Sequence, residues 1–401
     1  MKTAFMRLRF TSQPVLDPIT MHSTLLTHHF PAVRLFASAK GWVDGEALRQ
    51  LYAAAKLEGV RHVAGFPDLH PGKGGPVGAA LVTEGVIYPH LIGGDIGCGM
   101  ALFKTDLVQR DIKLNRWAEL HFDLEHPWEG GVREVLDASN LESMEFDDAL
   151  GTIGGGNHFA ELQRVEEVLD AKAFKQFGLG KQQLAVLVHS GSRGLGESIL
   201  RAYVEVHQAN GSDAESFAAA AYLKDHDLAV RWAKVNRSLI ARRFVEALGA
   251  EAQLLWDGCH NSITRCESDG EVVWVHRKGA VVTQGEPVII PGSRGSLSYL
   301  VKPLGDGASH AWSLAHGAGR KWARSETRLR MRERFGVHQL TQTPLGSRII
   351  CEQRELLYEE APAAYKNIED VIQGLVDAGL VSVIATFRPL LTYKCRTKNA
   401  E

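Results

Sequence analysis

Glycine-rich segments that separate short apolar runs constrain the fold of this chain more than any other feature. Glycines are dense in residues 65–99 and again in residues 151–156, and such segments are typical of loops between strands. The short strands and helices expected around them are interleaved without the regular alternation of a doubly wound sheet. A chain of 401 residues with 45% hydrophobic residues can bury a large core. The pattern predicts an α+β fold with one large domain.

Periodicity and capping residues predict individual elements. Asp213 is a candidate cap for the clearest helix, which runs to about Leu248 with apolar residues three and four apart. Leu184 to Val188 is a candidate buried strand. The other expected elements are a helix over 45–57, mostly helical structure over 106–150, a helical stretch from about 157, two or three strands over 272–301, a basic helix after 316, a helix over 367–378 and a strand over 381–393.

Charge and cysteine content limit the class of protein. The formal net charge is −2, so any contact with nucleic acid has to come from a local basic patch. The five cysteines are odd in number and scattered, which argues against a disulfide framework and favours a reducing compartment. No apolar run is long enough for a transmembrane helix or a signal peptide. We therefore expect a cytoplasmic protein with no membrane partner.

Five residues have side chains that can bind metals. Asp95 and Cys98 lie three residues apart in a glycine-rich loop that can turn both side chains toward one point. His158, His189 and His260 each lie beside small or polar residues, in the kind of turn where metal ligands occur. An isolated cysteine or histidine is more often a buried structural residue, but the five together are equally compatible with a mixed dinuclear site. The softness of these ligands favours zinc as much as manganese.

A second group of residues is suited to phosphate chemistry. His316 is followed by Gly-Ala-Gly-Arg, so the backbone can approach a phosphate and Arg320 can bind it in a bidentate fork. A neutral imidazole can attack phosphorus to give a phosphoramidate. Seven basic residues lie between Arg320 and Arg334, which favours phosphate binding next to His316. The structural alternatives are a polar helix start and a solvated helix face.

Other nucleotide-binding motifs are absent from the sequence. There is no phosphate-binding loop of the Gly-x-x-x-x-Gly-Lys-Ser/Thr type and no Lys-x-Asp-Gly motif, the nucleophile motif of ligases that use lysine. The glycines of residues 72–78 superficially resemble a dinucleotide-binding turn, but Pro76 occupies the place where a helix should begin. If a nucleotidyl group is held covalently, a lysine in that setting is not its carrier.

Taken together and in order, the motifs resemble the RtcB family of RNA ligases. The matching stretches are FPDLHPG at 66–72, GDIGCG at 94–99, GTIGGGNHF at 151–159, HSGSRG at 189–194, VHRKGA at 275–280, IPGS at 290–293 and HGAGR at 316–320. The similarity extends from about residue 35 to Lys394. It implies a poorly matched leader over 1–30, a catalytic domain over 31–394 and a tail over 395–401.

The resemblance also implies a ligand set for two manganese ions. Asp95, Cys98 and His158 resemble the ligands of one ion. Cys98, His189 and His260 resemble the ligands of the second, so that the thiolate of Cys98 would bridge both.

Further roles follow from the same resemblance. His316 resembles the histidine that is guanylylated, and Asp68 resembles an acidic residue close to the metals. The residues that resemble the surroundings of the guanylate are Asn157, Glu161, Asn261, Ser293, Ser298, Tyr365 and Lys394. The residues that would hold phosphates or RNA are Arg193, Lys278, Arg320 and Arg324.

The activity that the resemblance implies is GTP- and manganese-dependent RNA ligation. An RNA 3′-phosphate or 2′,3′-cyclic phosphate end would be joined to a 5′-hydroxyl end through a guanylylated histidine and an RNA-(3′)pp(5′)G intermediate. The length is similar to that of shorter bacterial members, which favours RNA repair over tRNA splicing, and an archease-like activator is a candidate partner. Arg294, where the family usually has methionine, and the residues after Lys394 depart from the pattern.

Two alternatives remain beside the ligase. A metal-dependent phosphoesterase that opens or removes terminal phosphates without sealing would use the same metal ligands. Retention of His316 and of the guanylate contacts argues for ligation instead. An RNA-binding protein on an inactive ligase scaffold is disfavoured, because every expected ligand and His316 are present.

Overall fold

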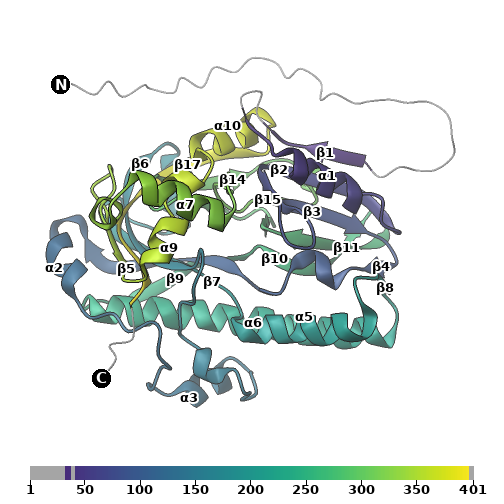
Figure 1. Cartoon of the computed structure of the whole chain (residues 1–401), viewed down its shortest axis with the longest axis horizontal. Coiled ribbons are helices and arrows are strands. Elements are labelled where there is room, and N and C mark those ends of the chain that lie inside the picture. The colour runs from purple at the N-terminus through teal and green to yellow at the C-terminus, as the bar shows by residue number, and fades with distance from the viewer. Residues whose placement is uncertain (1–31, 38–40, 397–401) are drawn as a thin grey trace.

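The computed structural model describes residues 32–37 and 41–396, and its fold is the expected α+β type. The expected leader over 1–30 and most of the tail over 395–401 lie outside these described residues. Two large sheets pack against each other, and helices cover their outer faces (Figure 1). Within the described ranges, no helix has both the length and the apolar character that crossing a bilayer requires.

The smaller of the two large sheets has five strands. In spatial order they are β1 (Ala32–Leu35), β2 (Val60–His70), β3 (Val77–Thr83), β11 (Glu271–Lys278) and β10 (Asn261–Ser268). The helix expected over 45–57 is confirmed as α1 (Gly45–Ala54), which begins where the Asp44 carboxylate accepts a hydrogen bond from the amide of Glu46. Leu51 of α1 packs with Val63 and Leu81 on one face of this sheet.

The larger sheet has seven strands in one path and an eighth at its side. In spatial order they are β13 (Val288–Ile290), β14 (Ser298–Pro303), β17 (Val381–Cys395), β6 (Phe159–Val168), β7 (Gln183–Ser190), β5 (Gly99–Val108) and β9 (Ala252–Cys259), and β16 (Arg348–Cys351) pairs with β17. Neighbours along the path from β14 to β9 are antiparallel.

The side chains of β7 show how the core is divided. Leu184 and Val186 face the long helix α6 (Phe217–Ala247), whereas Ala185 and Leu187 face the core between the two sheets. This alternation is the period of two that a strand imposes. A strand that is buried on both faces has a continuous apolar sequence. The buried strand expected at 184–188 is confirmed as part of β7.

The N-cap of the long helix α6 is Ser216, three residues after the expected cap Asp213. The Ser216 hydroxyl accepts from the amide of Ala219 at 3.1 Å, whereas Asp213 belongs to the short strand β8 (Ser212–Asp213). α6 lies beneath β5, β7 and β9, and α10 (Ile368–Asp377) lies on the opposite side of the molecule (Figure 1).

Other element predictions were wrong in part. The stretch after Asn157, expected to be helical, is strand β6, because pairing with β7 and β17 overrides the local preference of its glutamates. Residues 106–150 contain only short helices, α2 (Leu114–Glu119) and α3 (Val132–Ala138), between turns. The region over 272–301 contains four strands rather than two or three, since β12 (Ala280–Val282) is an additional short one.

The remaining elements complete the layers. The helices are α4 (Ala171–Phe177), α5 (Gly194–His207), α7 (Arg324–Arg334), α8 (Val337–Leu340) and α9 (Arg354–Glu359). The short strands are β4 (Val86–Ile87), which pairs with β8, and β15 (Ser313–Ala315), which pairs with β12. The basic helix expected after 316 is therefore α7, and the helix and strand expected at the C-terminal end are α10 and β17.

Candidate metal and nucleotide site

The five expected metal ligands lie at or beside one edge of the larger sheet. Cys98 immediately precedes β5, His158 immediately precedes β6, and His260 immediately follows β9. His189 lies near the end of β7. Because neighbouring strands in the order β6-β7-β5-β9 are antiparallel, two strand starts and two strand ends meet at this edge. The sheet therefore brings together residues that are far apart in the sequence.

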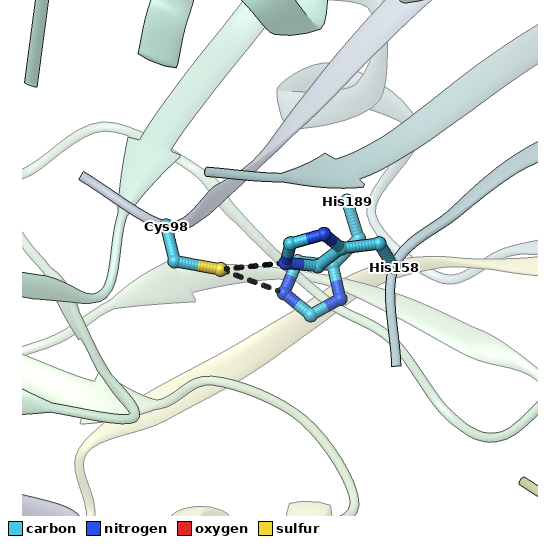
Figure 2. Close-up of side chains that lie close together, drawn as sticks. All are labelled: Cys98, His158 and His189. Atoms are coloured by element: carbon cyan, nitrogen blue, oxygen red, sulfur yellow. Dashed lines mark hydrogen bonds between the residues drawn. The ribbon is translucent and has the colours of Figure 1, made fainter. Parts of the chain in front are cut away.

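The side chains of Cys98, His158 and His189 point toward one another (Figure 2). The Cys98 Sγ lies 3.5 Å from His158 Nε2 and 3.3 Å from His189 Nε2. These three buried groups could hold a metal ion. Asp95 Oδ2 lies 3.0 Å from His158 Nε2, and the His260 ring centre lies 5.1 Å from that of His189. All five residues expected as metal ligands are therefore neighbours.

The hydrogen bonds around these residues fit a divalent cation. His158 Nδ1 contacts the carbonyl of Ile153 at 3.1 Å, and His189 Nδ1 contacts the carbonyl of Asn157 at 3.2 Å. A ring nitrogen that donates to a carbonyl leaves the other nitrogen of the ring with a lone pair, the usual arrangement for metal-binding histidines. Asp95 Oδ1 and His260 Nδ1 are buried and have no hydrogen-bond partner. Buried polar atoms without partners are costly, and a bound cation would satisfy them.

Burial sets the protonation of this cluster. Desolvation, followed by the neighbouring His158 and His260, lowers the pKa of His189 well below its usual value, so the ring is neutral. Desolvation and then the nearby His316 do the same to the pKa of His260. Desolvation, reinforced by Asp95, raises the pKa of the Cys98 thiol. A bound cation reverses this effect and favours the thiolate.

His316 and Asp68 form a hydrogen-bonded pair next to the cluster. His316 Nδ1 donates to Asp68 Oδ2 at 2.7 Å, and the His316 amide donates to the same oxygen at 3.2 Å. The Asp68 side chain is fully buried. Since Nδ1 holds the ring proton, Nε2 keeps its lone pair. The His316 ring centre lies 4.9 Å from that of His260.

Glycines allow the close approach around His316. Gly319 has a φ of +68°, and a Cβ at this position would overlap the backbone carbonyl of Asp68. Gly279 has a φ of +62°, and a Cβ there would lie 2.9 Å from His316 Cε1. Both positions combine a left-handed backbone with a close neighbour, so only glycine fits without strain.

A cavity of about 590 Å³ opens beside His316. His189 at its wall belongs to the metal-ligand cluster. The residues expected near a guanylate or its phosphates that line the cavity are Asn157, Ser293, Arg320, Arg324, Tyr365 and Lys394. Burial lowers the pKa of Lys394 to about 8, and its ammonium lies 5.9 Å from the centre of the Phe159 ring.

Three other expected nucleotide residues belong to buried hydrogen-bond networks. Glu161 accepts from Gln163 Nε2 at 2.7 Å and from Thr392 Oγ1 at 2.5 Å. The same Gln163 amide donates to Ser298 Oγ at 2.9 Å. Asn261 donates to the Asp95 carbonyl at 3.2 Å and accepts from the Gly279 amide at 2.9 Å. Asn261 thus joins the loop of Asp95 to the turn that contacts His316.

The expected phosphate-binding side chains are partly engaged within the protein. Arg320 Nη1 lies 3.1 Å from Glu360, and Arg324 Nε lies 3.4 Å from the same carboxylate. Lys278 Nζ donates to the Lys73 carbonyl at 2.5 Å, and burial lowers its pKa to about 8.

Arg193 and the other arginines of α7 are also engaged. Arg193 contacts Thr152 Oγ1 at 3.3 Å, and burial lowers its pKa. Arg328 and Arg332 of α7 pair with Glu355 of α9. Most basic residues between Arg320 and Arg334 thus have acidic partners. Arg324, which begins α7, lies at the cavity wall, where it could bind a phosphate.

Sequence reasoning missed a buried carboxylate at the cavity. Glu360 lies at the cavity wall, is 3% exposed, and accepts hydrogen bonds from Arg320, Arg324 and the Tyr365 hydroxyl. The nearby Lys394 and Arg320 outweigh its desolvation and lower its pKa. Glu360 lies in the sequence segment Glu-Glu-Ala-Pro at 359–362, and nothing in that segment indicates that this glutamate lies beside Arg320.

Sequence reasoning also missed two buried residues of α6 that hold the metal-site loops. Arg237 is fully buried, forms an ion pair with Asp257 at 2.7 Å, and donates to the carbonyls of Gly97 and Ser190. Asn236 accepts from the amide of Gly151 and donates to the carbonyl of Gly191. These bonds fix the backbone beside Cys98 and His189.

The comparison with known families agrees with this geometry. The sequence model of the family described as tRNA-splicing ligase RtcB matches residues 50–148 and 118–395. The chain belongs to the RtcB family. The resemblance inferred from the motifs is thereby confirmed.

Curated members of the RtcB family match along nearly their whole length. RNA-splicing ligase RtcB2 of Escherichia coli (strain ATCC 25922) is 44% identical over 363 residues, which cover 90% of this chain and 96% of the relative. The tRNA-splicing ligase RtcB of Nanoarchaeum equitans is 30% identical over 90% of this chain and 95% of the relative. RNA-splicing ligase RtcB of Escherichia coli K12 is 29% identical over 93% of this chain and all of the relative.

Proposed function

We propose that this member of the RtcB family is a GTP- and manganese-dependent RNA ligase with His316 as its nucleophile. RNA ligation follows from the family and from its relatives, whose names are RNA- or tRNA-splicing ligases. The observation that supports the nucleophile best is the bond from His316 Nδ1 to the buried Asp68, at 2.7 Å, beside the cluster that could hold metal. This bond leaves Nε2 as the nucleophilic nitrogen.

The first proposed step forms guanylylated His316. Nε2 attacks the α-phosphorus of GTP, a nitrogen–phosphorus bond forms, and the bond to the β-phosphate oxygen breaks so that pyrophosphate leaves. The positive charge that develops on the imidazole is stabilised by the Asp68 carboxylate. Asp95, Cys98, His158, His189 and His260 would hold two manganese ions. When bound, such cations neutralise phosphate charge and orient the leaving group.

The next steps transfer the guanylate and seal the RNA. An oxygen of the RNA 3′-phosphate attacks the guanylate phosphorus, and the nitrogen–phosphorus bond breaks to give RNA-(3′)pp(5′)G. The 5′-hydroxyl of the second RNA end then attacks the 3′-phosphorus and releases GMP. A 2′,3′-cyclic phosphate is first opened by hydrolysis. Arg324 at the cavity wall and Lys278 at the end of β11 would bind phosphate oxygens.

The biological setting is a further part of this proposal. The chain covers 96% of the bacterial relative named RNA-splicing ligase RtcB2 and shares 44% identity with it. We assign the chain to the shorter bacterial members and its reaction to RNA repair. We place the reaction in the cytoplasm and include an archease-like protein as a candidate activator.

The proposed chemistry is tested by two nicked RNAs. One has 3′-phosphate or cyclic phosphate and 5′-hydroxyl ends, and the other has 3′-hydroxyl and 5′-phosphate ends. We expect GTP-dependent sealing of the first only. His316→Ala should abolish sealing, whereas His338→Ala, which changes an exposed histidine of α8, should leave it unchanged. Sealing of the second RNA would overturn the mechanism, and loss of the terminal phosphate without sealing would favour the phosphoesterase.

A further inference from the structure

Two buried cysteines meet where the last strand of the chain ends. Cys351 is the last residue of β16 and Cys395 is the last residue of β17. The two residues are partners in the parallel pairing of these strands, just after a shift in register between Ile350 and Cys351, and their sulfur atoms lie 3.6 Å apart. Both thiols are free. Among the described residues, no other two cysteine sulfurs are in contact at hydrogen-bonding distance.

The backbone geometry at this pair is suited to a disulfide. Adjacent strands in a sheet lie about 4.8 Å apart, within the range of Cα separations of about 4.4–6.8 Å that a disulfide spans. The two sulfurs therefore need side-chain rotation rather than backbone movement to reach bonding distance. Few pairs of residues 44 positions apart in a chain meet this requirement, and here both members are cysteine.

The position of the pair also allows a small oxidant to reach it. Each cysteine is the terminal residue of its strand, and Cys351 is followed by the exposed residues Glu352 and Gln353. Strand ends open locally more readily than strand centres. Cys98 and Cys259 also lie at strand ends, but they lie beside the candidate metal ligands, where β5 and β9 pair.

We propose that Cys351 and Cys395 are a redox-modification site, at which a hydroperoxide forms a reversible disulfide that fastens the C-terminal strand to β16. The sulfur of one cysteine attacks a peroxide oxygen, which gives a sulfenic acid and releases one water molecule when the peroxide is hydrogen peroxide. The second thiol attacks this sulfur, the sulfur–sulfur bond forms, and a second water molecule leaves. Two thiols are oxidised and one hydrogen peroxide is reduced. A dithiol reverses the step by thiol–disulfide exchange.

The chemistry of the pair favours Cys395 as the attacking thiol. The hydrogen bond between the two thiols lowers the pKa of Cys395 and raises that of Cys351. A lowered pKa increases the fraction of thiolate, which is the nucleophilic form. The resulting link would close a loop that includes α9 and α10, and it would lie next to Lys394 at the cavity wall.

The test uses the full chain and hydrogen peroxide as the probe. After oxidation, the remaining thiols are alkylated and the digested protein is mapped by mass spectrometry. We expect a cross-linked peptide that joins Cys351 to Cys395, which disappears after treatment with dithiothreitol. It should be absent from Cys351→Ser and Cys395→Ser and retained in Cys266→Ser, which changes a partly exposed cysteine outside the pair.

Thermal unfolding provides a second measurement that does not depend on ligase activity. Closing the loop should raise the melting temperature of the oxidised wild type by a few degrees, and neither single variant of the pair should show this rise. Wild-type protein in which both thiols remain alkylatable after peroxide treatment would overturn the proposal. A disulfide to Cys98 or Cys259 in place of the expected one would overturn it as well. Mapping of the wild type remains decisive if either variant fails to fold.

Discussion

At the scale of single residues, the site depends on histidines whose two ring nitrogens have different partners. His158 and His189 direct Nδ1 to backbone carbonyls and Nε2 to the Cys98 sulfur. His316 directs Nδ1 to Asp68. The same ring can therefore act as a metal ligand or as a nucleophile, and the hydrogen bond at Nδ1 decides which nitrogen remains available.

The position of Cys98, whose sulfur contacts both His158 and His189, leads to a prediction about metal content. Cys98→Ala should lower bound manganese more than His158→Ala, because a bridging thiolate would serve both ions whereas the histidine would serve one. The measurement is metal per protein by inductively coupled plasma mass spectrometry after manganese loading and gel filtration. Cys266→Ala is the matched control and should keep the wild-type content. Equal and small losses from the two site variants would contradict bridging.

The carboxyl of Glu161 leads to a prediction about base choice and pH. Burial raises its pKa to about 7, and the bonds from Thr392 and Gln163 only partly offset this shift. Guanine offers two donors to a carboxylate and adenine does not, so GTP should be used well above ATP. The carboxylate is ionised above its pKa, so the preference should weaken as pH falls from 8 to 6, values chosen about one unit either side of this pKa.

Glu161→Ala tests the same claim. The ratio of initial labelling rates with GTP and ATP should fall toward one and should lose its dependence on pH. A variant that discriminates as well as the wild type at both pH values would show that another residue reads the base.

At the scale of elements, the strand ends of the larger sheet position the candidate metal ligands, and side chains of α6 bind the backbone beside them. Arg237 contacts the loop before β5, the end of β7 and Asp257 of β9 in one buried network. A fully buried guanidinium is tolerated because its carboxylate partner and two carbonyls satisfy it. Stability of the fold and geometry of the site therefore depend on the same side chain.

This network predicts that substitutions of two arginines of α6 differ greatly in their effect on the free energy of unfolding. Arg237→Met leaves the Asp257 carboxylate buried without its partner, and we expect a loss of about 3–5 kcal/mol in the free energy of unfolding. Arg242→Met breaks an exposed pair with Glu246 in the same helix and should cost less than about 1 kcal/mol. Urea unfolding monitored by circular dichroism measures both. Similar losses in the two variants would contradict a structural role for the buried pair.

Sequence patterns predicted elements well where local signals were sufficient. The apolar run of β7 and the periodicity of α6 gave the correct element types, because burial on two faces or on one stripe leaves a direct pattern. The stretch from about 157 was expected to be helical, but it is strand β6, because it pairs with two neighbouring strands. The candidate metal ligands could be singled out because each lies beside small residues in a turn, and the structure brings them close together. The role of Arg237 could not be anticipated, because Arg237 and Gly97, which it contacts, are 140 positions apart in the sequence.

At the scale of the whole molecule, the positive and negative charges are nearly balanced, and most arginines of α7 are paired with acidic residues. There are 45 basic and 47 acidic residues, and α7 faces the acidic side chains of α9. The molecule therefore has little excess positive charge with which to attract RNA over a distance. Binding has to rely on a few phosphate contacts close to the cavity.

This balance predicts a shallow dependence of RNA binding on salt. Each phosphate contact to single-stranded RNA contributes about 0.7 to the slope of log affinity against log salt concentration. Arg324→Ala should lower the slope by about one such contact. Arg330→Ala, which removes an arginine of the same helix that pairs with Glu326 and does not line the cavity, should leave it unchanged. Fluorescence anisotropy of a labelled 3′-phosphate RNA over a salt series gives these slopes, and equal effects of the two changes would exclude the specific role of Arg324.

The proposed mechanism depends on guanylylation of His316, which intact-mass spectrometry after incubation with GTP and manganese measures. Wild-type protein should gain the mass of one guanylate, and the adduct should be labile to acid and stable to base, as expected of a phosphoramidate. Asp68→Asn should form the adduct more slowly, by a factor on the order of 10² to 10⁴, because the developing imidazolium loses its carboxylate. His316→Ala should show no adduct while His338→Ala behaves as wild type. An adduct that persists in folded His316→Ala protein, or that maps to a lysine, would show that His316 is not the nucleophile.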